Sequence, residues 1–290
     1  MSSLRISGIV LLLAFLGVAA LRTVAMRREQ QATQVEAAQK ERVREFWNTY
    51  RKASQALATN DLQAAIPLYQ AALSLKPDHE DSLYYLGNCY FQSGRYQEAL
   101  SMYERLITVH PLGSSRGYMQ RALVHACLET SAPFDLQKAE RYFREALRVD
   151  PDSGAQMGLG EVAVLQGAWP KAWDALQVAN ADNAMSVAAP YLLGYLRWRA
   201  DEQAEAWRWF RLAVQRVEVK KPPVAWSEEG NVKADPKLRW QALARQSVFG
   251  SHWLRLLDYV KQPDLSPSLM EREYQRLQGV LTAAQKRVRG

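Results

Sequence analysis

The chain has 290 residues, of which 48% are hydrophobic, so it is long enough to bury a substantial core. Its formal net charge is +7, with 30 acidic residues interspersed among 37 basic ones. This mixing is typical of solvated helix faces and argues against a nucleic-acid groove. Cys89 and Cys127 are the only cysteines and both lie within apolar helical patterns, which argues against a structural disulfide.

The chain opens with an apolar segment. Residues 6–21 carry no charge and contain a dense run of Leu, Val, Ile and Phe. As a helix this segment would span about 24 Å, which is short for a bilayer unless residues 22–26 extend it. Small residues at 18–20 also suit the cleavage site of a signal peptide. Length alone therefore leaves both a membrane anchor and a cleaved signal peptide open.

The charges that flank the apolar segment favour an anchor. Three arginines crowd its C-terminal side, Arg22, Arg27 and Arg28. Positive residues tend to stay in the cytoplasm, so we expect residues 1–26 to be retained, with residues 6–26 in the membrane and the rest of the chain cytoplasmic. The alternative is a cleaved segment and a periplasmic or secreted product. Residues 27–45 are rich in Gln, Glu, Ala, Lys and Arg without Pro or Gly, which predicts a solvated helical stalk.

After the stalk, an aromatic slot recurs at a fixed interval. Tyr50, Tyr84 and Tyr118 are each 34 residues apart, Met157 follows after 39, and Tyr191 comes 34 later. Only units of constant length return a side chain to the same surface in this way. The interval therefore predicts a stack of similar structural units.

Residues 80–113 form the clearest unit. One helical stripe contains Leu83, Leu86, Gly87 and Tyr90, and a second contains Ala99, Tyr103 and Leu106. Gly87 and Ala99 are small where two helices would cross, Tyr103 is large enough to fill the space beside them, and Gly94 accepts the left-handed conformation at a helix end. The unit is therefore predicted to be a helical hairpin.

This pattern resembles the tetratricopeptide repeat. Small and large residues recur in the same slots of further second helices, at Ala65 and Tyr69, Ala139 and Phe143, Ala172 and Leu176, and Ala206 and Phe210. The resemblance covers residues 46–217 and implies an all-α, right-handed solenoid of about five hairpins. Two departures stand out: the third unit carries an insertion around 130–134, and Asp201 replaces the usual turn glycine of the fifth.

The period is lost beyond Val217. Residues 218–235 are polar and contain prolines, which predicts a loop. Asp235 and Pro236 suit the start of a helix that would run to about residue 260, and Ser266-Pro267 suits the start of another. We expect residues 236–290 to form a helical cap over the apolar end of the last repeat.

In this family the first helix of each hairpin lines a concave groove that receives a segment of another protein. The resemblance implies that the partner-binding residues here are Tyr50, Tyr84, Asn88, Phe91, Tyr118, Tyr191, Tyr195, Trp198 and Arg199. Aromatic rings supply stiff contact area, and Asn pairs with a peptide backbone in both directions. Tyr50 and Ser54 stand where one subclass has the lysine and asparagine that grip a C-terminal carboxylate, which argues against that mode. The aromatic rings could also serve only to pack helices.

The sequence lacks the patterns of an enzyme. The four histidines are scattered, no cysteine pair has zinc-site spacing, and no Gly-rich phosphate loop follows a strand pattern. We therefore expect no catalysis, no metal and no cofactor. The predicted function is a membrane-anchored scaffold that binds a protein partner in its aromatic-lined groove and assembles or localises a complex. The alternatives are a self-associating homo-oligomeric subunit of an envelope or secretion assembly, and a cleaved exported repeat protein.

Overall fold

The computed structural model describes residues 3–110, 112–152, 154–219, 240–241, 243–260 and 265–289. Within these residues the side chains of 3–21, 24, 25, 219 and 289 are left undescribed. Every regular element in the described ranges is a helix. This confirms the predicted all-α class.

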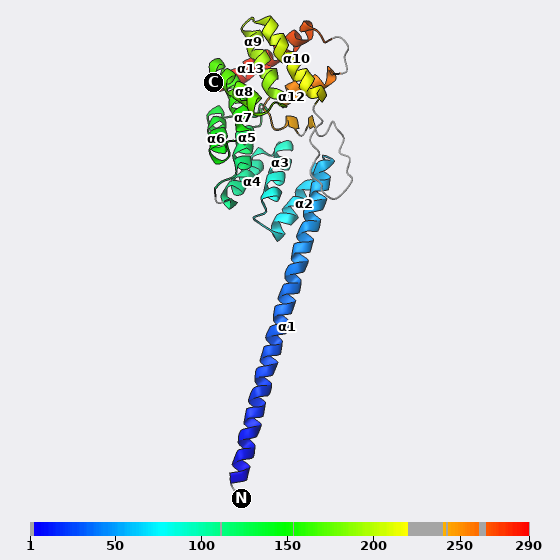
Figure 1. Ribbon diagram of the computed structural model, residues 1–290, viewed down its shortest axis with the longest axis vertical. Helices are drawn as coiled ribbons and strands as arrows, with labels where there is room; N and C mark the ends of the chain where they lie inside the picture. Colours follow the sequence, from blue (N-terminus) through cyan, green and yellow to red (C-terminus); the bar gives the residue numbers. More distant parts are fainter. Residues whose placement is uncertain are drawn as a thin grey trace.

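Ten helices of the described chain pair into antiparallel hairpins that stack in chain order (Figure 1). The pairs are α1 (Ser3–Ala58) with α2 (Leu62–Leu75), α3 (Glu80–Gln92) with α4 (Tyr96–Val109), α5 (Ser115–Ala126) with α6 (Leu136–Val149), α7 (Ala155–Gln166) with α8 (Trp169–Asp182), and α9 (Ala188–Arg199) with α10 (Gln203–Val219). Each hairpin packs against its neighbours, as the interval predicts.

The second helices supply the repeating core. In each, an alanine is fully buried and the residue four positions later is a large side chain exposed by at most 1%: Tyr69, Tyr103, Phe143, Leu176 and Phe210. A Cβ on Gly87 would overlap the ring of Tyr103, so only glycine allows this crossing. The predicted roles of Gly87 and Tyr103 are confirmed.

The turns inside the hairpins follow the same interval. Asn60, Gly94, Gly167 and Asp201 all have positive φ, between 60° and 73°. Asp201 therefore takes the left-handed position that glycine takes elsewhere, which Asn and Asp tolerate because their short side chains bond locally. The third hairpin instead has a loop over residues 127–135, the place of the predicted insertion.

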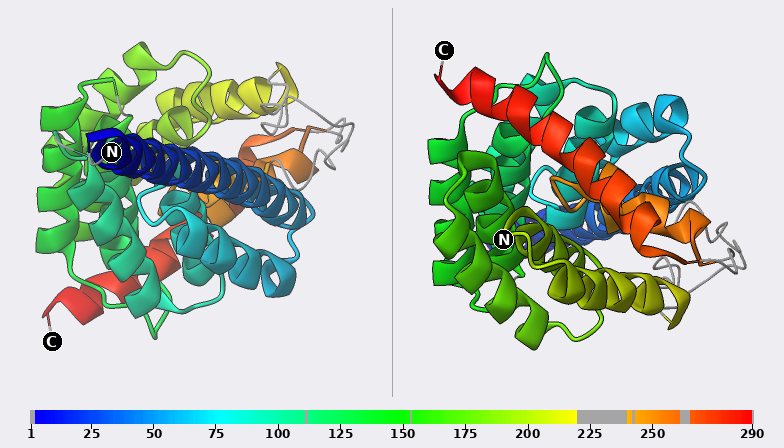
Figure 2. Two further views of the ribbon diagram at one scale, coloured as in Figure 1. Left: turned by 90° about the horizontal axis from the view of Figure 1, so that it is seen from below. Right: turned by 90° about the horizontal axis from the view of Figure 1, so that it is seen from above.

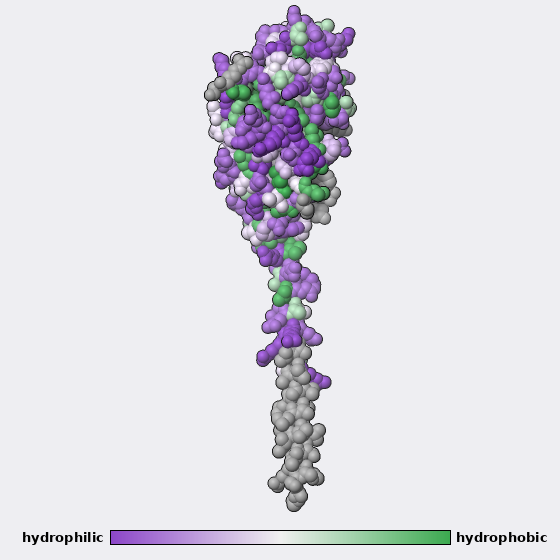
Figure 3. Space-filling view, turned by 90° about the vertical axis from the view of Figure 1, so that its left-hand side faces the viewer, coloured by the Kyte–Doolittle hydropathy of each residue, from purple (hydrophilic) through white to green (hydrophobic). Residues whose placement is uncertain are grey.

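Residues 3–58 form one helix in place of separate elements. Helix α1 continues from residue 3 into the first hairpin and is about 84 Å long at 1.5 Å per residue. All side chains from 26 to 45 are exposed, and Figure 3 shows this part projecting from the hairpins with hydrophobic residues interspersed among hydrophilic ones. Most of the expected anchor, residues 1–26, lies outside the described side chains. In the part of the chain that the structure describes, no helix is long and apolar enough to span a bilayer.

The prediction of one continuous helix up to residue 260 is wrong for the part that the structure describes. Residues 240–241 and 243–244 are helical, but a series of turns follows at 245–249, and after it come only the short α12 (Gly250–Trp253) and the 3-10 helix η1 (Leu254–Asp258). A Cβ on Gly250 would overlap the carbonyl of Ala244, so the chain folds back tightly at this point. The expected helix start at Asp235 and Pro236, and the expected loop apart from residues 218 and 219, lie outside the described residues.

Helix α13 (Pro267–Arg289) begins at the predicted proline. It lies across the hairpins, which Figure 2 shows from above. The Tyr274 hydroxyl donates to the carbonyl of Tyr191 in α9 at 3.1 Å, and Arg287 donates to the carbonyl of Leu128, just beyond α5, at 2.9 Å. The expected cap over the last repeat therefore extends over three hairpins.

A buried carboxylate fixes the segment between α10 and α13. Glu161 of α7 is fully buried and accepts hydrogen bonds from the Ser247 hydroxyl, from the Val248 amide at 3.0 Å and from the Phe249 amide at 3.5 Å. Arg245 in the same segment donates to Asn60 at 3.2 Å, so this segment bridges the fourth hairpin and the first. Burial outweighs the three donors and raises the pKa of Glu161 to about 7.

We expect the substitution Phe143→Ala to lower the free energy of unfolding by about 3–5 kcal/mol, because it removes a buried ring from between two hairpins. Urea titration followed by circular dichroism measures this change. The control is Val178→Ala on the exposed face of α8, for which we expect a change below about 0.5 kcal/mol. Equal effects of the two substitutions would refute the packing role of Phe143.

We expect Glu161 to make the fold less stable as pH rises. The pKa of its carboxyl group is about 7 in the folded chain and 4.5 when unperturbed. Below about pH 4.5 the group is protonated in both the folded and the unfolded chain. As pH rises from there through about 7, the unfolded chain loses this proton more readily than the folded chain, so the free energy of unfolding falls. The substitution Glu161→Gln should remove this dependence and gain about 3 kcal/mol relative to the parent between pH 4.5 and 8. Unfolding titrations of both proteins across this range provide the comparison. Parallel pH profiles would contradict the expectation.

Candidate protein-binding site

Four rings meet where α1 enters the first hairpin. Trp47 packs edge-on against Phe46 and Tyr50, with ring centroids 5.0 and 5.9 Å apart, and His79 lies 5.0 Å from the Tyr50 ring. Trp47 is nevertheless 51% exposed, which is unusual for so large an apolar side chain. Its neighbours hold the indole in place while its outer surface stays in solvent.

The rings continue from α1 to α5. Tyr50 lies 6.0 Å from the buried Tyr69 of α2, Tyr69 stacks on Tyr85 of α3, and Tyr85 lies 5.2 Å from Tyr84. The guanidinium of Arg116, from α5, lies 4.9 Å above the Tyr84 ring. We call Phe46, Trp47, Tyr50, His79, Tyr84, Tyr85 and Arg116 the aromatic face.

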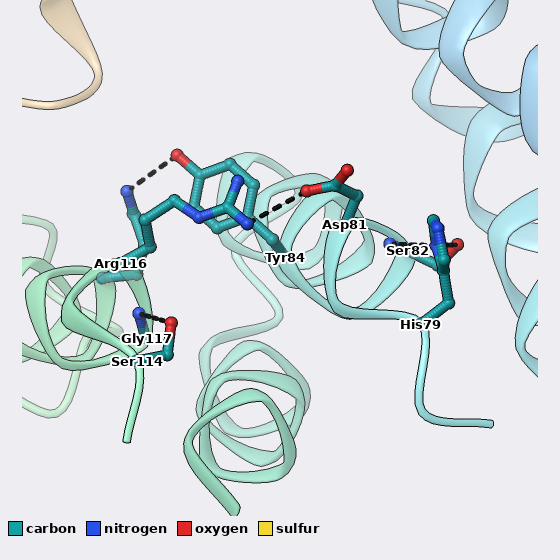
Figure 4. Close-up of polar contacts among 8 residues, drawn as sticks. His79, Asp81, Ser82, Tyr84, Ser114, Arg116 and Gly117 are labelled. Carbon is teal, nitrogen blue, oxygen red and sulfur yellow. Dashed lines mark hydrogen bonds and ion pairs between the residues drawn. The ribbon is translucent and has the colours of Figure 1, made fainter. Parts of the chain in front are cut away.

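Helix starts position the two polar members of this face (Figure 4). His79 caps α3 by accepting a hydrogen bond from the Ser82 amide at 3.2 Å, which fixes its ring beside Tyr50. Ser114 caps α5 through the Gly117 amide, and Arg116 therefore leaves the first turn of α5 toward α3. Burial, with Lys76 nearby, lowers the pKa of His79, so its imidazole is neutral at pH 7.

The charge balance at Arg116 is easily changed. Arg116 pairs with Asp81 at 3.0 Å, and both side chains are nearly half exposed. Such a pair contributes little to stability, so another carboxylate or a carbonyl can replace Asp81 at small cost. Gln120 donates to the Tyr84 hydroxyl at 3.4 Å, which leaves that hydroxyl able to donate in turn. The aromatic face thus combines stiff apolar area with hydrogen-bond donors.

The structure brings only part of the predicted set to this face. Tyr50 and Tyr84 belong to it, whereas Asn88 accepts a hydrogen bond from Tyr103 at 2.8 Å inside its own hairpin. Phe91 packs on Tyr96, with centroids 5.7 Å apart, and Tyr118 stacks on Tyr142 of its partner helix. These three side chains contribute to packing, because neighbouring helices lie within reach of them.

The expectation of an open groove is corrected for α9. Tyr191 and Tyr195 are fully buried, because α13 covers them: the Tyr195 hydroxyl donates to Gln278 at 2.5 Å. Trp198 donates to Glu271 of the same helix. Arg199 remains exposed and lies 3.9 Å above the ring of Trp169. Of the tyrosines that recur at the fixed interval, Tyr50 and Tyr84 are therefore partly exposed, whereas Tyr191 is covered by α13.

The sequence carried a signal for some of the residues that were missed. Trp47 and Asp81 are 34 residues apart and each precedes a slot tyrosine by three, a spacing that places them on the same helix face. His79 looked like an ordinary turn residue. Arg116 reaches Tyr84 only through the packing of α3 against α5, which no local pattern encodes.

Two family models described as Tetratricopeptide repeat match the chain, one over residues 56–119 and the other over 135–184. No curated protein sequence matches it. Both matched stretches lie within the hairpins, and the first includes α3 and the start of α5. Over these stretches the matches confirm the repeat type that the residue pattern resembles.

The likeness to solved structures of the same fold covers more of this chain than these two stretches do. PilW, titled a widely conserved type IV pilus biogenesis factor, shares 17% identity at a TM-score of 0.53 and covers 80% of this chain and 97% of its own. PilF of Pseudomonas aeruginosa shares 15% identity at 0.53, with 82% and 99% covered. The Thermus thermophilus repeat protein TTC0263 shares 23% at 0.50, with 60% and 93% covered. At these identities the likeness shows the fold. The chain therefore carries tetratricopeptide repeats over residues 56–119 and 135–184.

Proposed function

We propose that this chain is a membrane-anchored scaffold that holds a segment of another protein against the aromatic face and thereby localises that protein. The observation that supports this most is the half-exposed Trp47, which packs against rings of α1 and against His79, while Arg116 lies over the ring of Tyr84 on the same face. Trp, Tyr and Arg dominate the binding energy of protein interfaces because they bury much area with few rotatable bonds. The scaffold has no catalytic role in this proposal.

The preferred partner segment follows from the chemistry of the face. Apolar or aromatic side chains would cover Trp47 and Tyr84, and an acidic side chain or backbone carbonyl would replace Asp81 on Arg116. Burial raises the pKa of Tyr50 to about 12, so its hydroxyl keeps its proton at neutral pH and remains a donor. The likeness to PilW and PilF is one of fold and indicates no pilus partner.

The anchor in this proposal rests on the sequence. Residues 6–21 are uncharged and apolar, and Arg22, Arg27 and Arg28 follow them. Helix α1 runs without interruption from this segment to Trp47. A protein bound on the aromatic face would therefore be held at a fixed height above the membrane surface.

We expect the paired substitution Trp47→Ala and Tyr84→Ala to weaken partner binding by about 100-fold, since each removes a central aromatic contact worth at least about 1–2 kcal/mol. The full chain is tagged and crosslinked in native membranes, and the captured partners are identified by mass spectrometry. The affinity of a purified partner is then measured for both proteins.

The matched control is Val178→Ala, which also truncates an exposed apolar side chain but lies on α8, away from the face. It should bind as the parent does, and circular dichroism should show all three proteins folded. Unchanged affinity of the double variant would refute the aromatic face as the binding site.

We also expect the intact chain to stay with membranes after alkaline extraction, and a chain lacking residues 2–26 to be released, because an apolar helix of this kind resists extraction. Mass spectrometry of the mature N-terminus distinguishes a retained anchor from a cleaved signal peptide. A mature chain that starts beyond residue 20 would rule out the anchor and leave the binding proposal untouched.

A further inference from the structure

Helix α13 contacts three hairpins of the described chain. Helices of a repeat stack contact the adjacent units. Helix α13 instead runs over α9, past Gly167 at the end of α7, and reaches Leu128 beyond α5. It therefore crosses three hairpins along their first helices, as a separate bound helix would.

Helix α13 contacts Tyr191, Tyr195 and Trp198, three of the residues that the family resemblance predicts to bind a partner. Tyr274 lies 5.6 Å from the Tyr191 ring and 5.9 Å from the Tyr195 ring, and its hydroxyl donates to the Tyr191 carbonyl. Polar ends complete the contact, with Gln278 on Tyr195 and Glu271 on Trp198. Leu277 and Leu281 of the same helix are fully buried.

One polar atom under α13 is left without a partner. The Tyr191 hydroxyl is buried and makes no hydrogen bond among the described residues. Burying an unpaired hydroxyl costs free energy, so α13 does not satisfy every group of the surface that it covers. A helix with a suitable acceptor at this point would fit the surface better.

We propose that the inner face of the third to fifth hairpins is a helix-binding site and that α13 is its occupant within the chain. The ligand class is an amphipathic helix from a partner protein that repeats the α13 pattern: an acid, a tyrosine three residues later, an amide four residues after that, and leucines between and beyond them. Such a helix competes with α13 for Tyr191, Tyr195 and Trp198. This site is separate from the aromatic face and does not rest on the function proposed above.

The test loosens α13 in the full chain and supplies the same helix from outside. The substitution Leu281→Asp places a charge at a fully buried position, and its matched control Ala283→Asp places one on the exposed side of the same helix. The probe is a fluorescent peptide with the sequence of residues 267–289. Its anisotropy is titrated with the parent, Leu281→Asp and Ala283→Asp chains in detergent micelles.

We expect the Leu281→Asp chain to bind the peptide at least about ten-fold more tightly than the parent and the Ala283→Asp chain, because only its site is vacated. A peptide carrying Tyr274→Ala should bind the Leu281→Asp chain at least about ten-fold more weakly. Absence of saturable binding would overturn the proposal. Loss of the helical circular-dichroism signal in the Leu281→Asp chain would do the same, since α13 would then be an integral part of the repeat core.

Discussion

The stack depends on one repeated steric arrangement, a large side chain of a second helix pressed against a glycine, as at Tyr103, Phe143 and Leu176. Tyr103 lies where Gly87 has no Cβ, and Leu176 lies against Gly160 in the same manner. Such contacts fix how closely two helices approach, and constant unit length repeats the approach at every step. Everything that bears on function, from the placement of Tyr84 to that of Tyr191, follows from this repeated crossing.

An open stack has two ends and one inner face, and in this chain the two ends differ in what covers them. At the N-terminal end, α1 extends beyond the hairpins and Trp47 stays half exposed. At the other end, the chain returns and covers the inner stripe of α9, while Glu161 and Arg245 tie the returning segment to α7 and to Asn60. Aromatic residues in equivalent slots thus acquire different roles, because different parts of the chain lie over them.

This division explains what the sequence could predict. Helix pairing, the Gly87 crossing and the left-handed position of Asp201 are local properties, so a single unit of about 34 residues contains the information. The burial of Tyr191 and Tyr195 depends on residues 274 and 278, more than 80 positions away, and the turn at 245–249 depends on the carboxylate of Glu161. Local periodicity carries no information about such pairs. The contact of Asn88 is nearer in the sequence, because its amide oxygen accepts a hydrogen bond from Tyr103 of the same hairpin.

The continuity of α1 links the two ends of the proposed function. Between Arg22 and Trp47 the helix rises roughly 38 Å without a break, and exposed ion pairs such as Glu36 with Lys40 add only a little support. A flexible linker of the same length would let the aromatic face sample many distances from the membrane, whereas a helix holds both its distance and its direction. A partner bound beside Trp47 would then be presented at one height and in one orientation. That is a property a scaffold needs and a simple tether lacks.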